Sequence, residues 1–255
     1  MNFFENPDWF GRPGPFAYNL EYIVFMVLAI AFVFVLPILL KGKDKKIIKL
    51  LLIILWGVAV VLDLLKYGYL LISNAVNGTF TIANIDVPLW TCSMFLYLMP
   101  FVLFCKTEKV QRACTAFICT ISLFAGLVNF AVPAEESLFS FFGLHKMVYH
   151  YILLLTPAIM LGTGFIKLNL KDLLPSMIVL VIFAVPVYVF NAIFKQDYMF
   201  IYDGSFLPFD ASSISSVSKL LYTLLALIAY AVLALMVIGI DMGVRKLHEK
   251  IKKAK

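Results

Sequence analysis

Seven long apolar runs, separated by polar or mixed segments, occupy most of the chain. They cover about residues 18–40, 47–72, 89–105, 113–132, 144–165, 173–194 and 220–240. At about 1.5 Å per residue, each run is long enough to cross a hydrocarbon core of about 30 Å, with the third run the marginal case. The runs are continuously apolar, which favours helices over the alternating strands of a barrel. We therefore predict an all-α polytopic membrane protein with seven transmembrane helices in a single domain, 1–255.

Positively charged residues fall in alternate connections between these runs. Short loops rich in Lys and Arg stay in the cytoplasm, so their position sets the orientation. The connections between runs two and three and between runs four and five contain neither residue type. The alternation predicts an N-terminus outside and a cytoplasmic C-terminus, which requires an odd number of spans, and seven agrees. We expect a multi-pass protein of a bacterial plasma membrane. The basic residues on the predicted cytoplasmic side are Lys41, Lys43, Lys45, Lys46, Lys106, Lys109, Arg112, Lys167, Lys171, Arg245, Lys246, Lys250, Lys252, Lys253 and Lys255.

The composition supports a membrane protein and argues against one that binds nucleic acid. The chain is 63% hydrophobic and 14% charged, whereas soluble domains are about half apolar and about a quarter charged. Its formal net charge is +6, but most Lys and Arg residues lie in short loops and in the tail, 241–255. We expect membrane phospholipids as partners, with anionic headgroups at the tail. Alternatively, the tail is only the positively charged flank that stops translocation of the chain after the last transmembrane helix, and this explains its composition equally well. The oligomeric state is left open.

The cysteines point to a candidate nucleophile rather than to a metal site. Cys92, Cys105, Cys114 and Cys119 lie in or beside apolar runs without CxxC spacing, so neither zinc nor a disulfide framework is indicated. Cys92 follows Pro88, which suits the first turn of a helix. The free N–H groups and positive dipole end of that helix would favour a reactive thiolate. The alternative is that Cys92 is a small apolar side chain. No metal or soluble cofactor is expected.

Two histidines lie near the predicted outer end of run five. His145 could act as the general base of a Cys–His pair, because it and Cys92 lie on helices that start from the same side. The alternative is an interfacial histidine bonded to loop carbonyls. His150 follows five residues later and therefore lies on a different helix face. We expect it to be buried and hydrogen-bonded, or to contribute to substrate binding.

Other polar residues inside the runs are candidates for substrate binding. Asp63 and Lys66 are three positions apart on one helix face and could pair, hold a lipid phosphate or form part of a proton path. Asn129 and Asn191 lie near outer helix ends, where such residues often bridge helices. Tyr198 belongs to an aromatic segment that we expect to form a lid or to pack on the outer interface. These residues share the predicted outer side with Cys92 and His145.

The same residues carry a resemblance to a known family. Pro88-Leu89-Trp90-Thr91-Cys92, the helix from His145 to Leu155-Thr156-Pro157, and Asn191 followed by Asp197-Tyr198-Met199-Phe200 resemble the YwaF family of bacterial seven-helix membrane proteins. The resemblance extends over about residues 20–240. Those proteins are related to a eukaryotic transmembrane acyltransferase that builds ether phospholipids through a cysteine acyl-enzyme.

The resemblance implies that Cys92 is the nucleophile and His145 the base of a phospholipid acyltransferase. Family members often carry a histidine two residues before the cysteine, where this chain has Trp90, so any contribution of that histidine is missing here. The hypothesis is lipid acyl transfer through a cysteine thioester in the outer half of the membrane. The alternative is a small-solute or lipid transporter, or a sensor, with Asp63 and Lys66 as its coupling pair.

Overall fold

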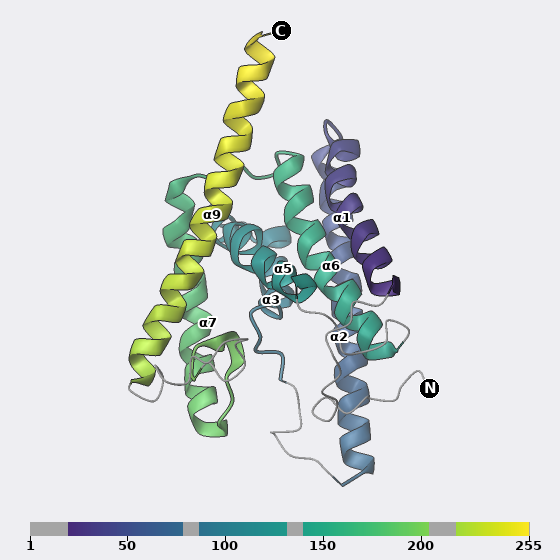
Figure 1. The fold of residues 1–255 in the computed structure, drawn as a ribbon, viewed down its shortest axis with the longest axis vertical. Helices are drawn as coiled ribbons and strands as arrows, with labels where there is room; N and C mark the ends of the chain where they lie inside the picture. The colour runs from purple at the N-terminus through teal and green to yellow at the C-terminus, as the bar shows by residue number, and fades with distance from the viewer. Residues whose placement is uncertain (1–19, 79–86, 132–139, 204–217, 255) are drawn as a thin grey trace.

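The computed structural model describes residues 20–78, 87–131, 140–203 and 218–254, and in these ranges the protein is all-α (Figure 1). A π-helical turn, η2 (Ile118–Ser122), joins α4 to α5, and two 3-10 turns, η3 (Leu170–Asp172) and η4 (Tyr198–Phe200), flank α7. The predicted fold class is therefore confirmed over the described ranges. The helices are α1 (Leu20–Leu40), α2 (Lys45–Val76), α3 (Met94–Phe104), α4 (Glu108–Phe117), α5 (Leu123–Ala131), α6 (Phe141–Gly162), α7 (Leu173–Phe194) and α9 (Lys219–Ala254).

Six helical segments in the described ranges are long and apolar enough to cross a membrane. They are α1, α2, the continuous α4–η2–α5 segment, α6, α7 with its preceding 3-10 turn, and α9. The apolar helix α3 has 11 residues, which cover only about 16 Å of a core of about 30 Å. Helix length and hydropathy thus show a multi-pass membrane protein. They match six of the seven predicted spans, and α3 is the marginal segment anticipated from the sequence.

Several helix ends differ from the predicted limits of the apolar runs. The second helix extends to 45–76, and the last continues to Ala254, so the basic tail prolongs α9. Lys and Glu are good helix formers, so a helix can outlast its apolar stretch. The third helix starts at Met94 rather than near Leu89, because residues 91–93 form turns in place of a first helical turn. The predicted start at residue 18 and end at residue 132 lie outside the described residues.

Contacts place the basic connections together on one side of the bundle, here called the basic side. The ends of α1 and α6 meet there, since a Cβ added at Gly162 would lie 2.5 Å from Pro37 Cβ. The start of α4 joins the same side through Arg112, whose Nε and one terminal nitrogen bond both carboxylate oxygens of Asp172 at 2.6 and 2.8 Å. The opposite side, where Val87 meets Tyr198, is called the outer side after the orientation predicted from the sequence.

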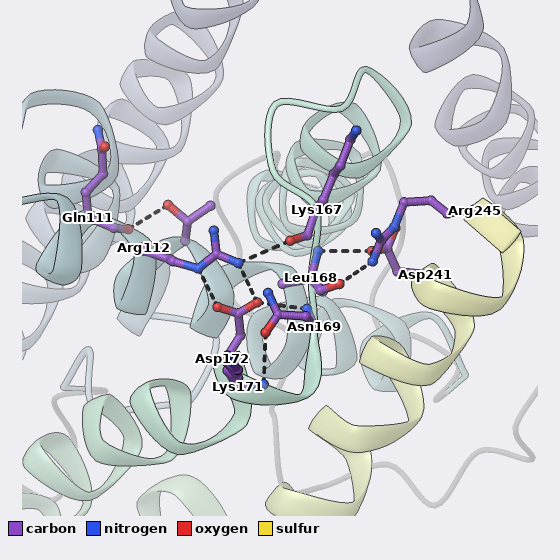
Figure 2. Close-up of polar contacts among 10 residues, drawn as sticks. Gln111, Arg112, Lys167, Leu168, Asn169, Lys171, Asp172, Asp241 and Arg245 are labelled. Atoms are coloured by element: carbon purple, nitrogen blue, oxygen red, sulfur yellow. Dashed lines mark hydrogen bonds and ion pairs between the residues drawn. The ribbon is translucent and has the colours of Figure 1, made fainter. Parts of the chain in front are cut away.

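Figure 2 shows how the basic side is tied together around the loop between α6 and α7. Asp241 of α9 accepts a hydrogen bond from the Leu168 N–H at 3.0 Å, and Arg245 donates to the Leu168 carbonyl. Arg112 of α4 donates to the Lys167 carbonyl at 3.3 Å. These bonds connect α4, the loop between α6 and α7, and α9, and so hold these segments together on the basic side.

The core lies around the segment α4–η2–α5, which occupies the middle of the bundle between α7 and α9 on one side and α2 and α6 on the other (Figure 1). Phe117, Ile118 and Ile121 have no exposed surface and pack in one cluster with Phe95 and Met99 of α3. α1 lies at the periphery, where most of its large apolar side chains are exposed. In a membrane this exposed apolar surface faces lipid.

Candidate functional site

A buried carboxylate–imidazole pair joins α2 to α6. His145 Nε2 donates to Asp63 Oδ1 at 2.8 Å, and each residue keeps only 7% of its surface exposed. Asp63 lies 18 positions after the start of α2 at Lys45, or about 27 Å along the helix from the basic side. His145 lies in the first turns of α6, which begins at the Ser140 N-cap. The pair therefore lies towards the outer side, where the sequence placed its polar candidates.

Tyr149 connects this pair to the chain at Cys92. Its ring stacks on His145, with 5.6 Å between centroids and 10° between planes, as expected for residues four apart on a helix. Its hydroxyl donates to the Cys92 carbonyl at 3.2 Å. The structure therefore brings Asp63 of α2, His145 of α6 and the backbone of Cys92, just before α3, into one cluster.

Cys92 lies two residues before α3 rather than inside its first turns. Ser93 is the N-cap, and the Cys92 carbonyl accepts from the Phe95 N–H at 3.2 Å. The side chain is partly exposed. The positive end of the α3 dipole still lies beside this residue, because the helix begins immediately after it. The predicted helix start is therefore wrong, and Cys92 precedes the N-cap of α3 instead of lying in its first turn.

Asn191 and Tyr198 form a second cluster on the other flank of Cys92. The buried Asn191 amide bonds both the N–H and the carbonyl of Tyr198, at 3.0 and 2.9 Å. The Tyr198 hydroxyl accepts from the Val87 N–H at 3.0 Å, and its ring packs edge-on to Trp90 at 4.8 Å. These two predicted site residues therefore position the chain that leads into Cys92.

The remaining predicted site residues are Lys66, His150 and Asn129. Lys66 Nζ lies 5.0 Å from the ring centroid of Tyr67. Asp63 forms an ion pair with His145. His150 Nδ1 donates to the Lys146 carbonyl at 2.7 Å, as predicted, but the residue is partly exposed rather than buried. The Asn129 amide nitrogen is buried and has no hydrogen-bond partner among the described residues.

Three residues of these clusters were not identified from the sequence. Tyr149 could have been found, because it is four positions after His145 and shares its helix face. Tyr230 bonds both the Thr91 hydroxyl, at 2.8 Å, and the Met199 carbonyl, at 2.9 Å. Thr91 is the third of these residues. It adjoins Cys92 in the sequence, whereas Tyr230 lies in a distant apolar run, and only the packing of α9 against the chain before α3 brings the two together.

The arrangement provides groups for nucleophilic chemistry. A thiol, an imidazole and a carboxylate are the components of a cysteine nucleophile with an oriented base. With Nε2 bonded to Asp63, a neutral His145 carries its lone pair on Nδ1, which can accept a proton. No group of three or more His, Cys, Asp or Glu side chains suited to a metal ion is found within the described ranges.

Comparison with known proteins identifies the family. The model of the TMEM164 family matches residues 16–239, and the chain therefore belongs to that family. The match covers nearly the range over which the YwaF resemblance was seen, but it does not bear on the YwaF name, which stays a prediction. No curated protein matches the chain. No solved structure matches it either.

Proposed function

From membership of the TMEM164 family and the geometry around Cys92, we propose that this membrane protein transfers acyl chains between lipids. Cys92 is the proposed nucleophile, and His145 is the base. The observation that carries the proposal is the buried Asp63–His145 bond of 2.8 Å, joined through Tyr149 to the Cys92 carbonyl. A base held in one orientation beside a cysteine is the arrangement that covalent acyl transfer requires.

In the first half-reaction, His145 Nδ1 takes the proton from the Cys92 thiol. The thiolate attacks the ester carbonyl of a phospholipid, and the carbon–oxygen bond to the glycerol breaks. The leaving alkoxide receives the proton from the imidazolium and departs as a lyso-lipid, while the acyl chain remains on sulfur as a thioester.

In the second half-reaction, His145 takes a proton from an acceptor hydroxyl or amine, which attacks the thioester carbonyl. The carbon–sulfur bond breaks, and the thiolate takes back the proton from the imidazolium. Atoms and charges balance without a metal or a soluble cofactor. The α3 N-terminus supports the developing oxyanion.

Asp63 has a different role here from the one predicted from the sequence. It lies 2.8 Å from His145 Nε2, so we assign it to orienting the imidazole and stabilising its protonated form. Lys66, one turn further along α2, is assigned to attracting the phosphate of the lipid. Asn129 and His150 remain proposed contacts to the substrate. The basic end of α9 remains a proposed contact to anionic lipid headgroups.

Intact-protein mass spectrometry tests the proposal directly. The purified protein is mixed with phosphatidylcholine vesicles, and its mass is measured before and after hydroxylamine treatment. We expect one fatty-acyl addition that hydroxylamine removes, absent from Cys92→Ala and retained in Cys105→Ala, the matched change at the partly exposed cysteine that follows α3. An adduct that persists in Cys92→Ala would refute the assignment of the nucleophile.

The transporter alternative depends on coupling between Asp63 and Lys66. The Asp63 carboxylate is hydrogen-bonded to His145 on another helix. This contact favours a role for Asp63 in orienting His145 over a coupling pair with Lys66 within α2. Vesicle uptake that survives Cys92→Ala but fails in Lys66→Met would favour transport instead.

A further inference from the structure

Residues 195–203, here called the outer segment, turn back from the end of α7 into the molecule (Figure 1). The ring of Tyr202 packs on Tyr188, six positions before the end of α7, with 5.5 Å between centroids. The Met199 carbonyl accepts from the Tyr230 hydroxyl, which lies 11 positions after the start of α9 at Lys219. Six and 11 helical residues correspond to about 9 and 16 Å, so the segment reaches well inside the outer ends of both helices.

Much of the backbone of the outer segment is hydrogen-bonded to groups of the protein. The carbonyls of residues 199, 200 and 201 accept from the hydroxyls of Tyr230, Tyr222 and Thr223, at 2.9, 3.1 and 2.7 Å. The Asp197 carboxylate accepts from the N–H groups of residues 202 and 203, at 2.7 and 3.2 Å. Irregular backbone at membrane depth must find such partners in the protein, because lipid offers none.

The conformation of the outer segment is also strained. Lys195, Met199 and Phe200 have φ values of 56°, 61° and 52°. These left-handed conformations are unfavourable for residues other than glycine and persist only where surrounding contacts hold them. Asn191 and Asp197, with 0% and 1% of their surfaces exposed, supply the buried side-chain bonds that hold this backbone.

The outer segment packs on the residues immediately before Cys92. The ring of Trp90 lies 4.8 Å from that of Tyr198 and 5.5 Å from that of Phe200. The Tyr230 hydroxyl bonds both the Thr91 side chain, at 2.8 Å, and the Met199 carbonyl. One α9 tyrosine thus fastens the segment to the chain that carries the nucleophile.

We propose that the outer segment is a fixed cover that keeps water away from Cys92, so that the thioester is transferred to a lipid hydroxyl or amine instead of being hydrolysed. This inference rests on the proposed function for its chemical consequence. Its physical content, exclusion of water from Cys92 by residues 195–203, does not depend on that function.

The two possible fates of the thioester differ only in the acceptor. Attack by a lipid hydroxyl or amine breaks the carbon–sulfur bond and yields an ester or amide and the free thiol. Attack by water breaks the same bond and yields a free fatty acid and the thiol. A cover that excludes water therefore sets the product without any change in the catalytic groups.

Cysteine labelling tests the cover without any assay of activity. The protein in phosphatidylcholine vesicles is treated with an uncharged reagent, N-ethylmaleimide, or with a permanently charged trimethylammonium thiosulfonate, and labelling of Cys92 is followed by peptide mass mapping. We expect the uncharged reagent to modify the partly exposed Cys92 and the charged reagent to react at least about tenfold more slowly, relative to free cysteine.

Tyr230→Phe and Tyr222→Phe each loosen the cover while keeping the aromatic ring. We expect each to raise the charged-reagent rate by about tenfold, because lost hydrogen bonds increase the open population of the segment. Tyr151→Phe is the matched control, since Tyr151 packs on Phe25 of α1. Equal rates of the two reagents in the unchanged protein, or unchanged charged-reagent rates in both variants, would overturn the cover.

Product analysis then tests the consequence for the reaction. With an acylated protein and a lyso-lipid acceptor, Tyr230→Phe should raise the ratio of free fatty acid to new phospholipid by about tenfold. An unchanged ratio despite faster charged labelling would overturn the link between cover and product. A protein that never forms the thioester refutes the proposed function instead, while the labelling result still decides whether the cover exists.

Discussion

At the scale of single residues, the Asp63–His145 pair is the feature with the most consequences. Both side chains are almost fully buried, and each is the polar partner of the other. A carboxylate in such a position stabilises the protonated imidazole and fixes its ring. The pair would be costly to maintain in a lipid environment without a function.

We predict that Asp63→Asn slows formation of the Cys92 thioester by about a hundredfold, because Asn cannot stabilise the imidazolium charge. The rate is measured by quenched intact-mass kinetics over a range of pH. The slowing should appear at every lipid concentration, as a change in kcat more than in KM. A variant that only weakens lipid binding, as expected for Lys66→Met, should instead raise KM more than it lowers kcat. Wild-type kcat in Asp63→Asn would rule out the orienting role.

Part of this cluster could be predicted from the sequence. Cys92 and His145 were found because both stand near the outer ends of apolar runs, where polar side chains are conspicuous. The partner of Asp63 was not found, because sequence spacing reveals only neighbours along one helix, and Lys66 was therefore the visible candidate. The actual partner lies 82 positions away and depends on the packing of α2 against α6.

At the scale of elements, the contact between α1 and α6 depends on the absence of a side chain at Gly162. A Cβ there would lie 2.5 Å from Cβ of Pro37, whose ring cannot rotate away. Most of the large apolar side chains of α1 are exposed, so the approach at Gly162 is important for its position.

We predict that Gly162→Ala destabilises the protein by about 1–3 kcal/mol, the range for overpacking a close contact. Gly57→Ala in α2 is the matched control, since a Cβ there meets nothing within 4 Å. That change should stabilise by about 0.5–1 kcal/mol through helix propensity. Unfolding in detergent by added dodecyl sulfate measures both. Equal effects of the two substitutions would contradict the close approach.

The observed helix ends show where the apolar pattern of the sequence is sufficient to predict a helix and where it is not. The runs located α6 and α7 to within a few residues. They failed at the start of α3, because Thr91, Cys92 and Ser93 are enclosed by apolar residues on both sides but form a turn, with the Ser93 N–H bonded to the Trp90 carbonyl at 2.9 Å. The π-helical turn η2 had no signal in the sequence, since its residues, Ile-Cys-Thr-Ile-Ser, suit an α-helix equally well.

At the scale of the whole molecule, the ties on the basic side join spans that are distant in sequence. Asp172 is 2% exposed and accepts two bonds from Arg112 and one from the Asn169 N–H at 2.8 Å. The Arg112 side chain is about half exposed. The carboxylate is therefore the buried member of the ion pair. Removing the arginine leaves this buried charge without its cation, which is the more costly loss.

We predict that Arg112→Met lowers the free energy of unfolding by about 2 kcal/mol, because it leaves the buried carboxylate without its cation. Asp172→Asn should cost less, and the double variant should cost less than the sum of the two. Dodecyl sulfate titration of the four proteins gives the coupling. Additive effects would show that the two groups do not depend on each other.

The orientation of the whole bundle is the final prediction, and α3 decides it. Contacts put the start of α4 on the basic side with Asp172, and Val87 on the outer side with Tyr198. The chain must therefore cross between residues 87 and 108, although α3 alone covers about 16 Å. Residues 87–93 lengthen the crossing, although their turns shorten them, and their backbone is bonded to protein groups such as Tyr198 and Tyr149. We predict that alkaline phosphatase is active when fused after Gly78 and inactive when fused after Thr107 or at the C-terminus, whereas a fluorescent protein at the C-terminus folds in the cytoplasm. Fusions after Gly78 and Thr107 that report the same side would show that α3 does not complete a crossing, and the N-out, C-in arrangement would then fail with it.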